Sequence, residues 1–237
     1  MTDLEYIKKY YNGPLDDAIK RLESGEPVQY IVGNVDFYGY NFEVNKNVLI
    51  PRFETEELVK YTLDIIKDEF NSPKILDIGT GSGCIAVTLK RELPDSVITA
   101  VDISNDALSV AKKNACDNNV NINFTNSDIF ENVDDKFDVI ISNPPYIKTI
   151  EEIDPKVEKN EPSIALYAGV DGLACYRKVL SNVSNYLNYK FLIAFEIGET
   201  QGNDLLLLAN KYLSDVDVEV KKDIYGRDRF VFIKNFE

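Results

Sequence analysis

Histidine is absent from the 237-residue sequence, and cysteine is scarce. Because histidine is the commonest general base and metal ligand, its absence excludes a Ser-His or Cys-His relay for nucleophilic catalysis. The three cysteines, Cys84, Cys116 and Cys175, are scattered and lack the paired spacing of a zinc site or a disulfide framework. We therefore expect buried structural thiols and no bound metal.

Basic residues are also few, with 26 lysines and arginines against 40 acidic residues and a formal net charge of -14. Such a charge disfavours binding along a phosphate backbone, so we expect no direct contact with nucleic acid. No apolar stretch reaches the length that spans a bilayer, and the N-terminus lacks the apolar core of a signal peptide. We expect no membrane partner and a cytoplasmic location.

The sequence as a whole has the composition of an ordinary globular protein, with 44% hydrophobic and 28% charged residues. Residues 1–27 have apolar side chains at helical spacing, which predicts a short helical N-terminal segment. Residues 28–50 carry β-formers such as Tyr30 and Val32 around turn signals, which predicts a β-hairpin linker. The main domain is then expected over residues 51–237.

Short apolar runs in the main domain alternate with helical segments, as is typical of βαβ units and a parallel sheet. The runs are residues 74–78, 97–101, 122–125 and 137–142. Two later runs, residues 216–221 and 229–233, are close enough to pair antiparallel. The pattern predicts an α/β fold, a doubly wound Rossmann-like sheet with helices on both faces.

A glycine-rich turn follows the first of these runs. Its residues are Gly79, Thr80, Gly81, Ser82 and Gly83, and Asp77 stands just before it; we expect all six to contribute to a cofactor site. Glycines let backbone amides approach a ligand closely at the start of the next helix. Asp102 ends the second run, where a carboxylate can accept hydrogen bonds from both hydroxyls of a ribose. We expect a nucleotide-like ligand at this edge of the sheet.

The same elements occur in NAD-binding proteins, but the spacing Gly79-x-Gly81-x-Gly83 differs from the dinucleotide GxGxxG pattern. The acidic Asp77 directly before the loop favours S-adenosylmethionine, although a turn or cap carboxylate is an alternative. Asp128, after the third run, can accept from the adenine amino group, with Ile129 against the ring. A capping or turn role for Asp128 is equally consistent with the sequence.

The most specific motif is Asn143-Pro144-Pro145-Tyr146, directly after the fourth run. Two prolines fix the backbone and remove amide donors, so the Asn143 side chain and the Pro144 carbonyl become rigid acceptors. An amide or exocyclic amine nitrogen is a poor nucleophile, and two such oxygens can each accept one N–H and aim it at a sulfonium methyl. Tyr146 would cover the planar group, or else pack in the core. The motif predicts a methyl-transfer site in which Asn143, Pro144 and Tyr146 act on an acceptor that Pro145 also contacts.

The chain resembles the release factor glutamine methyltransferases, the PrmC/HemK family, from about Glu26 to its C-terminus. The matching stretches are residues 26–33 (EPVQYIVG), 49–56 (LIPRFETE), the glycine loop, 143–147 (NPPYI), 161–162, 169–173, 196–198, Gln201, Asp223 and 226–229. The resemblance implies N5-methylation of the glutamine in the Gly-Gly-Gln loop of class I peptide chain release factors by S-adenosylmethionine. It also implies that residues 79–83, Asp102, Ile129 and Asn143 contact the cofactor, whereas residues 143–146 grip the glutamine.

Two features depart from the family. Phe53 stands where the family usually has proline, and only about 27 residues precede the predicted hairpin, where the family normally has a longer helical bundle that helps to dock the release factor. Arg52 and Glu54 can line the methionine end of the cofactor or form a surface ion pair. Glu196 can be a site residue or a helix cap.

Three other functions are compatible with these motifs. The first two are methylation of a ribosomal protein glutamine and of an exocyclic amino group of a flipped base. An isoelectric point of about 4.5 and the lack of a basic stretch disfavour methylation of a nucleic-acid base. The third is a cofactor-binding adaptor without turnover, which the intact Gly81, Asp102 and Asn143 disfavour.

Overall fold

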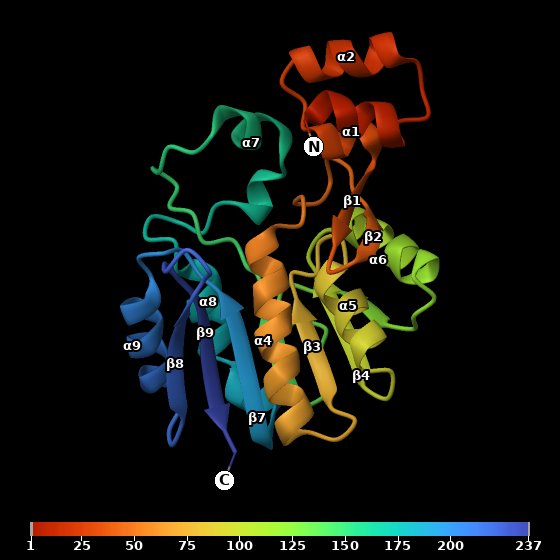
Figure 1. Ribbon diagram of the computed structural model, residues 1–237. Coiled ribbons are helices and arrows are strands. Elements are labelled where there is room, and N and C mark those ends of the chain that lie inside the picture. Colours follow the sequence, from red (N-terminus) through yellow and green to blue (C-terminus); the bar gives the residue numbers. More distant parts are fainter. Residues whose placement is uncertain (1, 237) are drawn as a thin grey trace.

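A seven-stranded sheet forms the centre of the computed structural model, which describes residues 2–236, and its strand order is β5-β4-β3-β6-β7-β9-β8 (Figure 1). The strands are Lys74–Ile78 (β3), Val97–Asp102 (β4), Asn123–Asn126 (β5), Phe137–Ser142 (β6), Leu187–Glu196 (β7), Asp217–Lys222 (β8) and Asp228–Asn235 (β9). The strands from β5 to β7 pair parallel, and β9 pairs antiparallel with both β7 and β8. The predicted α/β sheet, with its late antiparallel pair, is confirmed.

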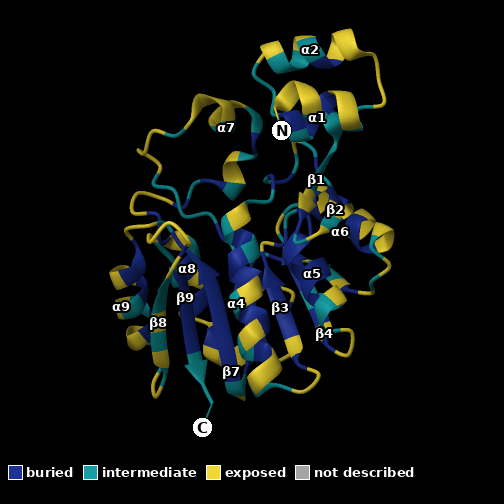
Figure 2. Cartoon of the chain, viewed as in Figure 1, coloured by how far each residue is buried: buried dark blue, intermediate teal, exposed yellow. Residues whose placement is uncertain are grey.

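Helices cover both faces of this sheet. On one side lie Phe53–Glu69 (α4), Cys84–Glu92 (α5) and Asn105–Asp117 (α6), and on the other Ala174–Leu180 (α8) and Gly202–Tyr212 (α9). Neighbours in one strand face opposite ways, so Ile75 packs with α4 and α5 while Leu76 packs with α8 and α9. The central strands β3, β6 and β7 are therefore buried through most of their length, whereas the edge strands β5 and β8 are not, as Figure 2 shows for β3, β7 and β8.

The direction of the chain reverses at β3. From β3 the chain moves outward to β4 and β5, and it then returns to place β6 on the opposite side of β3. Ligands of open α/β sheets bind in the crevice at such a switch point, beyond the carboxyl ends of the strands. The loops after β3, β4 and β6 meet at this edge, which lies at the top of the sheet in Figure 1.

The N-terminal segment contains three short helices, Asp3–Tyr10 (α1), Leu15–Glu23 (α2) and Val28–Val32 (α3). The expectation of β structure is wrong over α3, although Tyr30 and Val32 favour strands by residue type. Pro27 sets a φ of -57° before the helix, and Gly33 ends it at φ +85° with its N–H donating to Gln29 O at 2.7 Å. Because burial of the α3 side chains adds to these two signals, they outweigh the β preference of β-branched residues.

The predicted hairpin follows as Asn34–Phe37 (β1) and Tyr40–Glu43 (β2). Its Phe37 and Phe42 lie edge to face and join the core beneath α4 and α5. The helices α1 to α3 instead share a small cluster of their own, built on Ile7, Ala18 and Ile31. The division into residues 1–27, 28–50 and 51–237 stays a prediction.

The thiol expectation holds only in part, since Cys84 is buried, Cys175 is half-buried and Cys116 is exposed. Cys116 stands one residue before the end of α6, on the solvent side of that amphipathic helix. Within residues 2–236 no cluster of three or more potential ligands could hold a metal ion. No helix in the same range is long and apolar enough to cross a bilayer.

Replacing Gly83 with alanine is expected to destabilise the fold more than the same change at Gly25. Both glycines have a left-handed φ, +81° and +88°, at which a Cβ costs roughly 1–2 kcal/mol. At Gly83 the new Cβ would also lie 3.1 Å from Ala111 Cβ, whereas Gly25 faces open space. Overpacking adds about 1–3 kcal/mol, measurable by urea unfolding. Equal losses in the two variants would contradict tight packing of the glycine loop against α6.

Candidate active site

A cavity of about 410 Å³ opens at the carboxyl edge of the sheet. It is lined by the loops after β3, β4, β5 and β6 and by the N-terminal end of α4. Of the predicted site residues, those that line it are Gly79, Thr80, Gly81, Ser82, Asp102, Asp128, Ile129, Asn143, Pro144 and Pro145. The side chains of Asp77 and Tyr146, and Gly83, lie outside its lining. Its size suits a small-molecule ligand.

The glycine loop presents bare backbone to this cavity. Gly79 and Gly81 have φ values of +71° and +55°, and a Cβ at Gly79 would point into open space. The N–H groups of Gly79 and Thr80 both donate to Val101 O, which fastens the loop to β4. A nucleoside can therefore approach the main chain here without meeting a side chain. This cradle fits the cofactor that the sequence predicts.

Asp77 supports the loop from beneath. It is fully buried, its Oδ2 accepts from Thr80 Oγ1 at 2.6 Å, and its Oδ1 lacks a hydrogen-bond partner among the described residues. Burial raises the pKa of Asp77 to about 7. The structure thus places Thr80 between this carboxyl group and the cavity, and any direct contact of Asp77 with the cofactor stays a prediction.

Asp102 is held rigidly at the end of β4. Its Oδ2 accepts from Gly81 N and its Oδ1 from Ser104 N, both at 2.9 Å. Burial raises the pKa of this carboxyl, and the two backbone donors act against that rise. Each oxygen keeps lone pairs for further donors, so the geometry suits two adjacent hydroxyls of a ribose.

The far wall of the cavity carries an ion pair that the sequence did not reveal. Lys178 Nζ on α8 contacts Asp128 Oδ2, and both residues line the cavity. Ile129 beside them has a φ of +59°, which is unusual for a β-branched residue. Ser127 Oγ donates to Ile129 O at 3.0 Å and so helps to hold this strained turn.

Asn143 is the residue of its motif with the clearest polar contacts. Its Nδ2 donates to Thr55 Oγ1 at 2.9 Å, and Thr55 Oγ1 donates in turn to Glu196 Oε2 at 2.6 Å. Because Nδ2 is committed to Thr55, Oδ1 is the atom of the carboxamide that is left to accept from a ligand. Glu196 therefore lies behind the cavity wall, in contact with a residue of α4, and it does not cap a helix.

Tyr146 packs toward the core, in agreement with the alternative raised for it. It joins the cluster of α8 and α9, and its hydroxyl donates to Glu196 Oε1 at 3.5 Å. Gln201 Nε2 donates to Tyr146 O at 3.0 Å and fixes the backbone after the two prolines. Burial raises the pKa of the Tyr146 phenol. A direct role for Tyr146 in methyl transfer stays a prediction.

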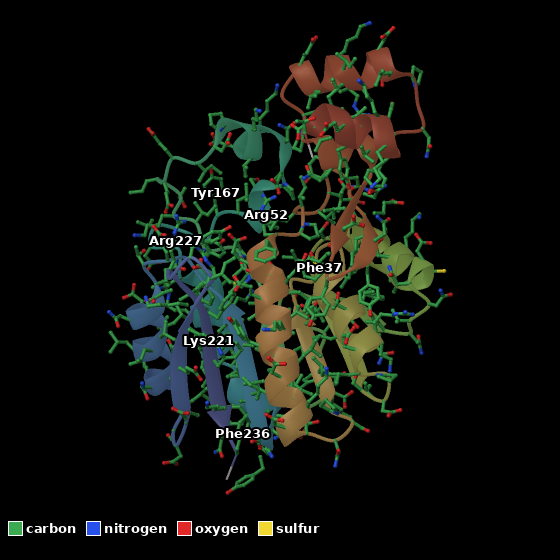
Figure 3. The ribbon with its side chains drawn as sticks, in the orientation of Figure 1. Phe37, Arg52, Tyr167, Lys221, Arg227 and Phe236 are labelled. Atoms are coloured by element: carbon green, nitrogen blue, oxygen red, sulfur yellow. The ribbon has the colours of Figure 1, made fainter. Side chains whose placement is uncertain are left out.

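The segment after Tyr146 is fastened over the cavity by Glu161, which follows helix Pro155–Asn160 (α7). The Glu161 carboxylate accepts from Arg52 Nη2 at 2.5 Å and from Ile50 N at 3.1 Å, and its side chain is 2% exposed. Arg52 and Tyr167 both line the cavity, and Figure 3 places them above the sheet. Glu54 does not line it. The sequence signals for this bond are the family matches at residues 49–56 and at Glu161-Pro162.

A doubly wound sheet, a bare glycine loop, an acid at the end of β4 and Asn143 at one cavity define an S-adenosylmethionine-dependent methyltransferase. A family model, the methyltransferase small domain, matches residues 58–159. The release factor glutamine methyltransferase of Lactococcus lactis is 43% identical over 222 residues, covering 93% of this chain and 82% of that protein. This chain belongs to the release factor glutamine methyltransferase family.

Two solved structures have the same fold as this chain. The protein-(glutamine-N5) methyltransferase (release factor-specific) of Alicyclobacillus acidocaldarius is 27% identical, with a TM-score of 0.52, and covers 83% of this chain and 100% of that one. The T. thermophilus 16S rRNA N2 G1207 methyltransferase, solved with AdoMet and guanosine, shares the fold alone. It is 15% identical with a TM-score of 0.63, over 85% of this chain and 49% of that one. The cofactor is S-adenosylmethionine, which supplies an electrophilic methyl group on a sulfonium.

Replacing Glu161 with alanine is expected to destabilise the protein by roughly 2–4 kcal/mol. The buried Ile50 N–H loses its hydrogen-bond acceptor, and Arg52 loses its ionic partner. The matched control is Glu69→Ala. Glu69 pairs with Lys190 at 2.8 Å with both side chains about a third exposed, and such a pair contributes under about 1 kcal/mol. Denaturant titration gives both values. A Glu161→Ala loss no larger than that of Glu69→Ala would show that the fastening is not structural.

Proposed function

We propose that this chain transfers the methyl group of S-adenosylmethionine to the side-chain amide nitrogen (N5) of the glutamine in the Gly-Gly-Gln loop of class I peptide chain release factors. The observation that carries this is the Asn143 carboxamide, held by Thr55 in the wall that also carries the glycine loop and Asp102. The names of the relatives support the same substrate. We place this reaction in the cytoplasm, without direct contact with nucleic acid.

For the cofactor we assign the nucleoside to the glycine loop. Asp102 would accept from the ribose hydroxyls, since its two oxygens are already oriented by backbone donors. The backbone of residues 79–83 would lie against the nucleoside, and Ile129 against the adenine ring. Asp128 would accept from the adenine amino group, although its pairing with Lys178 means that this contact is shared with a cation.

For the acceptor we assign Asn143 Oδ1 and the Pro144 carbonyl to the two hydrogens of the glutamine NH2 group. Transfer forms an N–C bond and breaks the S–C bond, so positive charge moves from sulfur to nitrogen. The two oxygens stabilise that charge through the hydrogens they hold, and the nitrogen then loses a proton to solvent. Alignment of the nitrogen with the methyl carbon supplies the remaining decrease in the activation free energy.

The direct test is methyl transfer from labelled S-adenosylmethionine to a purified class I release factor. A variant release factor with the Gly-Gly-Gln glutamine replaced serves as the matched control, beside ribosomal proteins and DNA as other acceptors. We expect label on the intact release factor alone. Label on the glutamine variant, on a ribosomal protein or on DNA would refute the substrate assignment, and cofactor binding without any transfer would indicate an adaptor.

Asn143→Ala is expected to lower kcat by about 10²–10³-fold, because one of two oxygens that hold the acceptor is lost. The affinity for S-adenosylmethionine, measured by calorimetry, should change far less. Single-turnover methylation of the release factor gives the rate. An unchanged rate would remove Asn143 from the proposed chemistry.

Asp102→Ala is expected to weaken cofactor binding by roughly 10–100-fold, the effect of losing hydrogen bonds to a charged acceptor. Asp106→Ala is the matched control, since Asp106 carries the same charge in the first turn of α6 but does not line the cavity. Calorimetry with S-adenosylmethionine compares the two. The ribose assignment is wrong should both variants bind like the parent chain.

A further inference from the structure

Three polar residues far apart in the sequence form one series of hydrogen bonds that runs from the cavity wall into the core. Asn143 lies 88 residues after Thr55, and Glu196 lies 141 residues after Thr55. Thr55 is 2% exposed and Glu196 is 1% exposed, so water does not supply alternative partners at either residue. The distances of 2.9 Å and 2.6 Å are those of well-formed hydrogen bonds.

The donor and acceptor in each of these hydrogen bonds follow from the number of protons available. A threonine hydroxyl has one proton, and an ionised Glu196 can only accept. Thr55 must therefore donate to Glu196 and can only accept from Asn143, and the sole donor of a carboxamide is its NH2 group. The Asn143 oxygen is then the atom that faces a ligand.

Protonation of Glu196 would remove this constraint. A neutral carboxyl can donate to Thr55 Oγ1, which frees the Thr55 proton to donate to the Asn143 oxygen. The carboxamide is then free to turn by half a rotation and to present its NH2 group to the cavity. Two NH2 groups cannot hold each other through donated hydrogens, so molecules with the carboxamide turned do not grip an amide acceptor.

The surroundings of Glu196 bring this equilibrium into an accessible range. Burial raises the pKa of Glu196 to about 7. Thr55 and the guanidinium of Arg229 on β9 act against the rise, Glu54 on α4 adds to it, and the Tyr146 hydroxyl lowers it again.

Two further titratable groups lie close by. Tyr176 on α8 donates to the backbone oxygen of Glu196 at 2.7 Å, and the Cys84 thiol lies at the start of α5. Burial raises the pKa of both groups, so they stay neutral where Glu196 titrates.

We propose that Thr55 and Glu196 are positioning residues that set which atom of the Asn143 carboxamide faces the acceptor. The inference rests on the proposed function, since it requires that Asn143 Oδ1 accepts from the substrate amide. Glu196 acts only through Thr55 and Asn143, and it takes no proton from the substrate. Methyl transfer therefore depends on an ionised Glu196, and kcat falls as the pH is lowered through its pKa.

The experiment compares Thr55→Val with Thr55→Ser in the full chain acting on intact release factor. Valine keeps the shape of threonine but removes the hydroxyl, whereas serine keeps the hydroxyl. We expect Thr55→Val to lower kcat roughly 10–100-fold at pH 8, with the affinity for S-adenosylmethionine within about threefold, and Thr55→Ser to restore most of the rate.

A second variant tests the charge itself and keeps the proposal falsifiable even where Thr55→Val folds poorly. Glu196→Gln cannot titrate, so the acidic limb of the kcat profile should disappear at whatever rate the variant retains. An acidic limb that persists in Glu196→Gln, or a Thr55→Val enzyme with the parent rate, would overturn the inference.

Asn143→Ala distinguishes a failure of the positioning role from a failure of the proposed function. Where Asn143→Ala is slow but Thr55→Val keeps the parent rate, the positioning role is wrong and the proposed function stands. Where Asn143→Ala itself turns over normally, the proposed role of Asn143 fails, and the positioning inference fails with it. Unfolding midpoints of all four variants identify any loss that comes from stability alone.

Discussion

Burial of the parallel strands on both faces dictates where chemistry can occur in this protein. Ile75 and Leu76 of β3 point to opposite faces and both are fully buried, so a ligand can reach polar groups only beyond the ends of the strand. The chain changes direction around β3, and the loops after β3, β4 and β6 therefore surround one crevice. Gly79, Asp102 and Asn143 each lie at or just after the end of their strand, and this common position brings them together.

The wall of this crevice has a repeated construction. Thr80 and Thr55 both line the cavity, and each donates at 2.6 Å to a buried acid behind it, Asp77 and Glu196 respectively. Burial raises the pKa of both acids to about 7. In each case a neutral hydroxyl separates the acid from the ligand. The acids orient the wall and do not present their charge on it.

Local signals explain what could be predicted from the sequence. Alternating apolar runs, the glycine loop and the Asn143 motif are each continuous in sequence. The strands form where the runs predict them, and Gly79, Gly81 and Asn143 line the cavity, whereas Tyr146 packs toward the core. The helix Val28–Val32 was missed because Pro27 and Gly33 outweigh β-branched preference there. Partners separated by about a hundred residues, such as Arg52 with Glu161, leave no local pattern, since only the folded chain brings them together.

On the proposed function, neutral acceptors at the wall would also account for a site without histidine. An amide nitrogen keeps both hydrogens until it attacks, so no base has to remove a proton beforehand. A carboxylate directly beside the sulfonium would attract it in the ground state, and that attraction would weaken as charge moved to nitrogen. In the proposed reaction the oxygens of Asn143 and Pro144 would act in the opposite sense, because their hydrogen bonds would strengthen as the nitrogen gained charge. On that proposal, keeping Asp77 and Glu196 behind threonine hydroxyls would favour the transition state over the bound substrates.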